Sequence, residues 1–326
     1  MIKVSVIVPI YKVEKFIERC VRSLMGQSLQ DVEYIFVDDA TPDASIQILN
    51  RVIVDYPDKT HTVKILTHEK NQGLPAARNT GLAAATGEYI FHCDSDDYVE
   101  LDMLESLYRV AKERQADIVW CDWYLSFETN ERYMKQPSYS TPMEALKAML
   151  GGAMKYNVWN KLVRHSLYTD NGVAFPSGYG MGEDMTMMLL FAYAKKVVYV
   201  PEAFYHYVKL NTNAFSQTYS EKHLEELCYN VQNTESKLKE LFGDALEQEI
   251  SFLKLEAKFP FLLSHDKCKR KLWREWYPEA NRYILKNHNI STRSRIIQWC
   301  AWKHLDGVVS LYRWLLNRVV YGIIYK

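Results

Sequence analysis

The residues whose types and spacing suit chemistry are aspartates that follow apolar runs. Asp94 and Asp96 stand two apart directly after the run Glu88–Cys93, and Asp39 ends an earlier run. Side chains two apart on an extended backbone point the same way, so Asp94 and Asp96 can ligate one ion. Mg²⁺ and Mn²⁺ prefer such hard oxygen ligands, which substrate phosphates complete. The spacing predicts a site for Mn²⁺ or Mg²⁺. The alternative is a solvated acidic turn before a helix that begins near Leu101.

The first 121 residues must position these aspartates, and they alternate between strand and helix patterns. The apolar runs that predict strands are Val4–Ile10, Val32–Val37, Val63–Leu66, Glu88–Cys93 and Asp117–Cys121. The helical spacings cover Glu14–Ser28, a segment starting at Asp43, Leu74–Ala85 and Leu101–Arg114. This alternation predicts an α/β fold with a mostly parallel sheet and helices on both faces. Ligands of such sheets bind outside the carboxyl ends of the strands, where the aspartates lie. No glycine-rich dinucleotide or P-loop motif is present.

The rhythm changes after Cys121, and this change sets the predicted domains. A short helix over Thr141–Leu150, a glycine-rich loop over 171–182 and a helix from Glu183 precede a strand at Val197–Val200. From 221 onward the pattern is helical. We therefore predict a catalytic domain over 1–220, with halves at 1–121 and 122–220, and a helical C-terminal region over 221–326.

Charge and cysteine content limit the partners and the compartment. The formal net charge is zero, which argues against nucleic acid, although residues 261–326 hold 13 Lys and Arg against four Asp and Glu. None of the six cysteines forms a CxxC pair, which indicates reduced thiols in the cytoplasm. No apolar run reaches the ~18–20 residues of a membrane span.

The last stretch is rich in Trp, Tyr and basic residues, a composition that suits a helix in a membrane interface. We expect peripheral contact with the cytoplasmic face of the inner membrane. The alternative is that these helices pack on the catalytic domain or on a second copy in a homo-oligomer.

Two segments carry a resemblance to a known family. The chain is similar to the family-2 inverting glycosyltransferases of the GT-A fold in VSVIVPIYKVEKFIERCVRSLMGQSLQDVEYIFVDDATPD and in NQGLPAARNTGLAAATGEYIFHCDSDD. The combination of V-P-x-Y, VDD, N-x-G-x-x-x-A-R-N-x-G and D-x-D in this order is specific, and the resemblance covers roughly 3–215. It implies a nucleotide-sugar donor, with a UDP-sugar favoured.

The resemblance implies roles for residues on the donor side. Pro9 and Tyr11 would line the base pocket, and Asp39 would accept a hydrogen bond from the base. Asn71 and Arg78 would contact the nucleotide and its phosphate. The D-x-D motif would contribute Asp94 to the ribose or the metal and Asp96 to the metal. The plainer alternatives are packing for Tyr11, a turn for Asn71 and an ion pair for Arg78.

Further roles fall in the second half. The resemblance makes Asp184 the catalytic base and gives Glu183 a substrate-binding role; both could instead stabilise a helix N-terminus. Trp159 and Lys161 would lie near the acceptor; the alternative is a buried Trp159 with Lys161 in an ion pair.

Two later residues, Lys209 and Ser216, would close over the diphosphate. Lys209 stands where arginine is expected, and it offers a point charge in place of a two-pronged contact. His206 could ligate the metal, but packing is the favoured interpretation.

The predicted function is transfer of a hexosyl or N-acetylhexosaminyl group from a UDP-sugar to a hydroxyl of a glycan or lipid-linked acceptor, in bacterial surface polysaccharide synthesis. Two rivals remain open: a metal-dependent nucleotidyltransferase, and a non-catalytic nucleotide- or carbohydrate-binding module.

Overall fold

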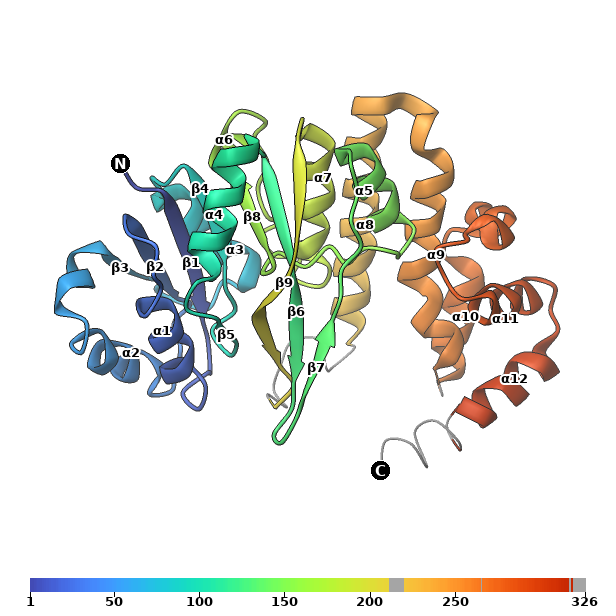
Figure 1. Ribbon diagram of the computed structural model, residues 1–326. Coiled ribbons are helices and arrows are strands. Elements are labelled where there is room, and N and C mark those ends of the chain that lie inside the picture. The colour runs from blue at the N-terminus through green and yellow to red at the C-terminus, as the bar shows by residue number, and fades with distance from the viewer. Residues whose placement is uncertain (211–219, 265, 317, 319–326) are drawn as a thin grey trace. The chain divides into compact units, whose positions relative to one another are not determined.

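A computed structural model describes residues 1–210, 220–264, 266–316 and 318. Within these residues one mixed sheet of nine strands runs through the N-terminal two thirds, with helices on both faces (Figure 1). The strand order is β3-β2-β1-β4-β8-β6-β9-β5, and β7 pairs with β6. The strands are β1 Val4–Ile10, β2 Val32–Asp38, β3 Val63–Thr67, β4 Tyr89–His92, β5 Tyr98–Val99, β6 Ile118–Ser126, β7 Glu131–Met134, β8 Lys161–Arg164 and β9 Val197–Val208.

The first half of the sheet is parallel, as predicted. In it β1 pairs with β2 and β4, and β2 pairs with β3. The second half is not parallel throughout. The predicted fifth strand becomes β6, which is separated from β4 by the antiparallel β8 and runs parallel to β9. The sequence pattern missed β8 because only four residues form it.

The helices around the sheet lie within about three residues of the predicted bounds, except α6, which the sequence pattern did not predict. They are α1 Ile17–Met25, α2 Ser45–Ile53, α3 Leu74–Ala84, α4 Met103–Arg114, α5 Pro142–Leu150, α6 His165–Thr169 and α7 Thr186–Tyr193, with 3₁₀ turns η1 Pro57–Thr62 and η2 Glu183–Met185. The apolar face of α1 is buried because Ile17, Cys20, Val21 and Leu24 recur at helical spacing.

Close packing of α3 on β1 fixes the position of the residues that α3 carries. A Cβ atom at Gly81 would lie 2.3 Å from Cγ2 of Ile7, so only glycine permits this approach. Arg78 lies one turn earlier on the same helix and is buried, with 1% of its surface exposed. The close packing that Gly81 permits therefore places the buried guanidinium of Arg78 against the sheet.

The chain divides into two compact units. The first comprises 1–146 and 156–234, and the second comprises 147–155 and 235–326. The division falls within α8 Glu221–Phe242, whereas we placed a boundary near residue 220. The first 14 residues of α8 thus belong with the sheet.

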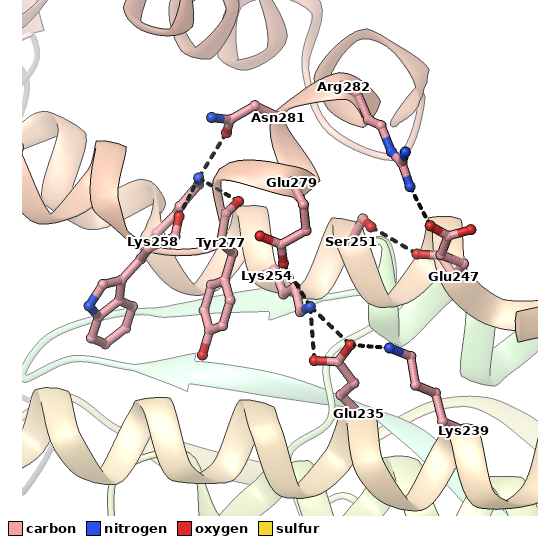
Figure 2. Close-up of polar contacts among 11 residues, drawn as sticks. Glu235, Lys239, Glu247, Ser251, Lys254, Lys258, Tyr277, Glu279, Asn281 and Arg282 are labelled. Carbon is pink, nitrogen blue, oxygen red and sulfur yellow. Dashed lines mark hydrogen bonds and ion pairs between the residues drawn. The ribbon is translucent and has the colours of Figure 1, made fainter. Parts of the chain in front are cut away.

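The second unit is helical, as predicted. After the end of α8 it contains η4 Gly243–Leu246, α9 Glu247–Leu263, α10 Lys267–Glu275, η5 Pro278–Lys286, α11 Thr292–Trp302 and α12 Asp306–Leu315. Two buried lysines of α9 hold η5 in place (Figure 2). Lys258 donates to the carbonyl of Trp276 at 2.7 Å and to Oδ1 of Asn281 at 2.8 Å. Lys254 contacts both Glu235 and Glu279.

The helix α12 exposes apolar side chains, as the predicted contact with a membrane surface would require. Val308, Leu311, Trp314 and Leu315 are each between 44% and 58% exposed. Among the residues that the structure describes, no helix has the length and apolar character needed to span a bilayer. All six cysteines are free thiols, in agreement with the predicted reduced state.

Candidate active site

The ends of β1, β2 and β4 meet at one edge of the sheet. The amide of Asp39 donates to the carbonyl of Ile10 at 3.0 Å, and the amide of Cys93 donates to the carbonyl of Ile7 at 3.0 Å. The residues after these strands are therefore neighbours, as the alternating pattern predicted.

Asp39 organises the loop that leads into α3. Its buried carboxylate accepts the backbone N–H groups of Gln72 and Gly73 at 2.7 and 2.8 Å. Oδ1 also lies 2.7 Å from Nδ1 of His68. Oδ1 thus has two partners and Oδ2 one, which leaves one lone pair of Oδ2 for a further donor. Its contact with a base stays a prediction.

The other residues predicted around the base differ in exposure. Tyr11 is 41% exposed, and Nζ of Lys12 lies 4.9 Å from the centre of its ring. Pro9 is buried within β1. Nδ2 of Asn71 lies 3.4 Å from the carbonyl oxygen of Asp39. The base-pocket roles of these residues stay predictions.

The D-x-D segment forms a turn whose side chains alternate between half-buried and buried positions. Asp94 and Asp96 are half-buried, whereas Asp97 is 1% exposed. Asp97 accepts hydrogen bonds from the Tyr205 hydroxyl and the Val208 amide, both at 2.7 Å. Burial raises the pKa of Asp97 well above its usual range, and the charges of Asp96 and Asp94 add to this rise. Asp97 fastens the turn to β9, and sequence reasoning did not find this role.

The two half-buried aspartates fit a divalent cation only together with substrate. Among the described residues, no group of three or more His, Cys, Asp or Glu side chains could hold a metal ion. Two carboxylates plus the phosphates of a nucleotide are the usual ligand set of Mg²⁺ in transferases. The donor set of Asp94 and Asp96 therefore fits a cation that arrives with a nucleotide diphosphate.

Arg78 joins the two acidic segments. Its Nη2 donates to Oδ1 of Asp94 at 3.0 Å and lies 3.8 Å from Oε1 of Glu183. Its guanidinium carbon lies 5.6 Å from the ring centre of Phe175. Although burial opposes it, the charges of Asp94, Asp184 and Glu183 raise the pKa of Arg78, so this side chain is a permanent cation. Its Nε and Nη1 have no hydrogen-bond partner among the residues that the structure describes.

The acid pair Glu183–Asp184 lies in η2, directly after Gly182, whose φ of +90° favours glycine. Burial raises the pKa of Glu183 well above its usual range, and the charge of Asp184 adds to it. Burial also raises the pKa of Asp184, to about 6, against the opposing charge of Arg78. Oδ1 of Asp184 is buried and has no hydrogen-bond partner in the described part of the chain. An ionised carboxylate oxygen without a partner can accept a proton.

Lys161 is a second buried cation near this acid. Its Nζ donates to the carbonyl of Asn157 at 2.6 Å and to Oδ1 of Asn160 at 2.8 Å. Burial lowers the pKa of Lys161 to about 7, and the charge of Asp184 acts in the opposite direction. The structure thus brings together Asp94, Arg78, Glu183, Asp184 and Lys161, which come from four separate elements.

Trp159 has little free surface. It is 5% exposed and stacks on Tyr205 and Tyr207, with ring centres 4.4 and 5.3 Å away. Its acceptor role stays a prediction.

Of the two residues predicted to close over the diphosphate, only one is described. Lys209 follows β9 and is exposed, with Nζ 3.4 Å from the Tyr207 hydroxyl. Ser216 lies outside the described residues. His206 bonds to Glu131 and Glu100, both at 2.8 Å, and stacks on Tyr98, so it packs in a network of its own.

Two residues of α8 hold the loop before the acid pair, and sequence reasoning missed them. Asn230 donates to the carbonyls of Tyr179 and Met181 at 2.9 and 3.0 Å, and Glu226 accepts from the Met181 amide at 2.9 Å. Both side chains are buried. No motif marks them, because they lie more than 40 positions after the loop they hold.

One residue inside a recognised motif also has a holding role. Asn79, which follows Arg78, bonds to both the amide and the carbonyl of Phe175 at 2.8 Å. It thereby places Phe175 against α3.

Comparison with known proteins identifies the family of this chain. The profile of glycosyl transferase family 2 matches residues 5–184, and the chain belongs to this family. It is 35% identical over 222 residues to the uncharacterised glycosyltransferase EpsJ of Bacillus subtilis, covering 66% of this chain and 63% of EpsJ. It is 32% identical over 257 residues to the cholesterol galactosyltransferase of Borreliella burgdorferi, covering 74% of this chain and 70% of that protein.

The fold has a solved counterpart. The crystal structure of residues 1–349 of TarS from S. aureus in complex with UDP-GlcNAc superposes with a TM-score of 0.69 at 20% identity, covering 98% of this chain and 92% of that one. The predicted GT-A fold is therefore confirmed. The chain spans less than two thirds of the length of EpsJ.

Proposed function

We propose that this protein is an inverting glycosyltransferase that moves a sugar from a UDP-sugar to a hydroxyl of a glycan or lipid-linked acceptor. The observation that carries the proposal is Oδ1 of Asp184, which is buried beside Arg78 and Asp94 and has no hydrogen-bond partner among the described residues. Membership of family 2 supports the reaction class.

The proposed reaction has one displacement step. The acceptor oxygen attacks the anomeric carbon, its O–H proton passes to Asp184, and the bond from the anomeric carbon to the diphosphate oxygen breaks. The diphosphate leaves with the electron pair, and the anomeric configuration inverts. Because the pKa of Asp184 is about 6, its carboxylate is ionised at neutral pH and still basic enough to take the proton.

On the donor side, Asp39 and Tyr11 would hold the base, and Asn71 and Arg78 would face the nucleotide. A cation held by Asp94 and Asp96 would neutralise charge on the leaving diphosphate. TarS was crystallised with UDP-GlcNAc, which supports a uridine nucleotide.

On the acceptor side, an exposed aromatic pair stands beside the catalytic loop. Tyr179 and Tyr229 stack with ring centres 3.6 Å apart and are 37% and 39% exposed. Their outer faces suit the apolar face of a sugar ring, and Glu183 would bind acceptor or donor hydroxyls. A relative is a cholesterol galactosyltransferase, which supports a lipid-linked acceptor and a hexosyl donor. An N-acetylhexosaminyl donor is the alternative.

We also propose a place for this reaction in the cell. The exposed apolar residues of α12, with the basic charge of residues 261–326, suit peripheral contact with the cytoplasmic face of a membrane. Assembly of a bacterial surface polysaccharide on a lipid carrier would take place there. If the protein does not bind membranes, the same apolar residues could instead pack against a second copy of the chain in a homo-oligomer.

The test is UDP release from a panel of UDP-sugars, with Mn²⁺, with Mg²⁺ and with EDTA, for wild type, Asp96→Ala and Asp102→Ala. We expect release from one donor that EDTA abolishes and that Asp96→Ala lowers at least a hundredfold. Asp102 is the matched control, because it is exposed and its side chain forms no helix cap.

Two results would contradict the proposal. If UDP binds in calorimetry but no donor and acceptor are turned over, the chain is a binding module. If UDP does not bind with or without metal, the assignment of a uridine nucleotide donor is wrong.

A further inference from the structure

The imidazole ring of His68 links three elements around the aspartate that is predicted to hold the base. His68 directly follows β3 and is 9% exposed. Its Nδ1 lies 2.7 Å from Oδ1 of Asp39, which follows β2, and its Nε2 lies 2.8 Å from Oγ1 of Thr80 in α3. Both ring nitrogens therefore have a partner, and the ring cannot turn without breaking a hydrogen bond.

The two contacts determine which way the hydrogen bonds of the ring run. An ionised carboxylate only accepts, so Nδ1 of His68 carries a hydrogen and donates to Asp39. A neutral ring then accepts the hydroxyl hydrogen of Thr80 at Nε2, whereas a charged ring donates to the hydroxyl oxygen. The donor toward Asp39 is the same in both forms, so the hold on Asp39 does not depend on the charge of the ring.

The Asp39 carboxylate is 3% exposed and has one acceptor position left. Oδ1 accepts from His68 and from the amide of Gln72, both at 2.7 Å, and Oδ2 accepts from the amide of Gly73 at 2.8 Å. A carboxylate has about four lone-pair positions, so one position of Oδ2 is open among the described residues. The ring of His68 and the two amides fix the plane of the carboxylate and thus the direction of this position.

We propose that His68 is a positioning residue that acts through Asp39 to select a base with an N–H group at the edge that Asp39 faces. This inference rests on the proposed function, in which Asp39 contacts the base of the donor. Uracil presents such a hydrogen at N3, whereas cytosine presents a lone pair at the same position. A buried acceptor that meets a lone pair stays unsatisfied, and this cost is the source of selectivity.

The fixed direction of the open acceptor is what makes the selection strict. If the carboxylate could rotate, Oδ2 would turn away from a base that lacks the hydrogen and the cost of the mismatch would fall. His68 prevents this rotation because its own ring is held from the far side by Thr80. The selectivity therefore depends on a side chain that does not itself contact the nucleotide.

The experiment measures the affinities of the full chain for UDP and CDP by calorimetry in Mg²⁺. The two nucleotides share the diphosphate, so the ratio of their affinities reports on the base alone. His68→Leu removes the donor, and His68→Asn is close to leucine in size but restores an N–H near the place of Nδ1. His61→Leu is the matched control, because His61 is an exposed histidine in η1.

We expect wild type and His61→Leu to prefer UDP strongly. His68→Leu should bind UDP about 10–100-fold more weakly and CDP almost unchanged, because a hydrogen bond to a charged group is lost only for the base that uses it. His68→Asn should recover most of the preference. In an Asp39→Ala background, His68→Leu should cause no further loss of UDP affinity, since His68 acts through Asp39.

Each other result overturns the proposal in a distinct way. If His68→Leu keeps the preference of wild type for UDP, His68 has no such role, and the uridine donor still stands. If folded His68→Asn is as weak as His68→Leu, packing of the ring is responsible and not its donor. If wild type binds UDP and CDP equally, Asp39 does not select the base. If it binds neither, both this proposal and the uridine donor are wrong.

Discussion

Replacing Asp184 with asparagine should abolish transfer and stabilise the folded protein at alkaline pH. The side chain is nearly the same size, so packing is kept while the charge is lost. Because the pKa of Asp184 is raised to about 6, the folded state binds this proton more tightly than the unfolded chain does. Stability therefore falls as pH rises from about 4 through 6, and the penalty is complete above that range.

The magnitude follows from the shift. The ordinary pKa is 3.8, so the rise is about two units, and each unit corresponds to about 1.4 kcal/mol. Ionised Asp184 thus costs the fold up to about 3 kcal/mol at pH 8. The amide of asparagine must find partners in the same buried place, which offsets part of the gain. We expect Asp184→Asn to be more stable than wild type by about 1–2 kcal/mol at pH 8, and less stable than wild type by about 1 kcal/mol near pH 4, where the carboxyl group of the folded protein is already neutral and only the cost of the buried amide remains.

The assay combines urea denaturation at the two pH values with transfer measured by UDP release. Activity should fall about 10²–10⁴-fold, the usual contribution of a general base. Asp102→Asn serves as the control, since it removes an exposed carboxylate and should change neither quantity. A variant that transfers at the wild-type rate would refute the base assignment. A variant that is less stable than wild type at pH 8 would refute the argument from burial.

Three further outcomes are expected. Asn230→Ala removes two hydrogen bonds that hold the loop before the acid pair. The kcat should therefore fall about 10–100-fold, while the UDP affinity measured by calorimetry stays unchanged. A fall in UDP affinity with unchanged kcat would contradict this positioning role. In Arg78→Lys the lysine cannot reproduce the planar donors that arginine presents to Asp94. The UDP affinity measured by calorimetry should therefore fall at least about tenfold. An affinity equal to that of wild type would exclude a contact between Arg78 and the nucleotide. The kcat/KM of wild type should rise with pH through about 6 as Asp184 ionises. Lys161→Met should move this midpoint upward by removing a nearby positive charge, and a downward move in the pH–rate profile would contradict the interaction between Lys161 and Asp184.

Local sequence was sufficient for the donor half of the fold. Val4–Ile10 is a strand over the predicted residues because a β-branched apolar run suits a strand buried on both faces. Strand and helix alternation then placed Asp39 and Asp94 on one edge of the sheet, since parallel strands end on the same side. The family resemblance rested on these same positions and was confirmed by the family match over 5–184.

The sequence was less informative where pairing is antiparallel or distant. Residues Lys161–Arg164 form a strand only because β4 and β6 flank them, and four residues carry too little periodicity to show it. The sequence does not distinguish Asp97 from the other acids of the D-S-D-D run. Its role depends on hydrogen bonds from Tyr205 and Val208, which lie more than 100 positions later in the chain.

The sequence by itself determined the family, the parallel half of the sheet and the types of residue at its edge, because these depend on periodicity and on motifs of adjacent positions. Only the tertiary structure decided which charges share one buried place. Arg78, Glu183 and Asp184 come from distant segments, and the raised pKa of Asp184 exists only because folding removes water from around it.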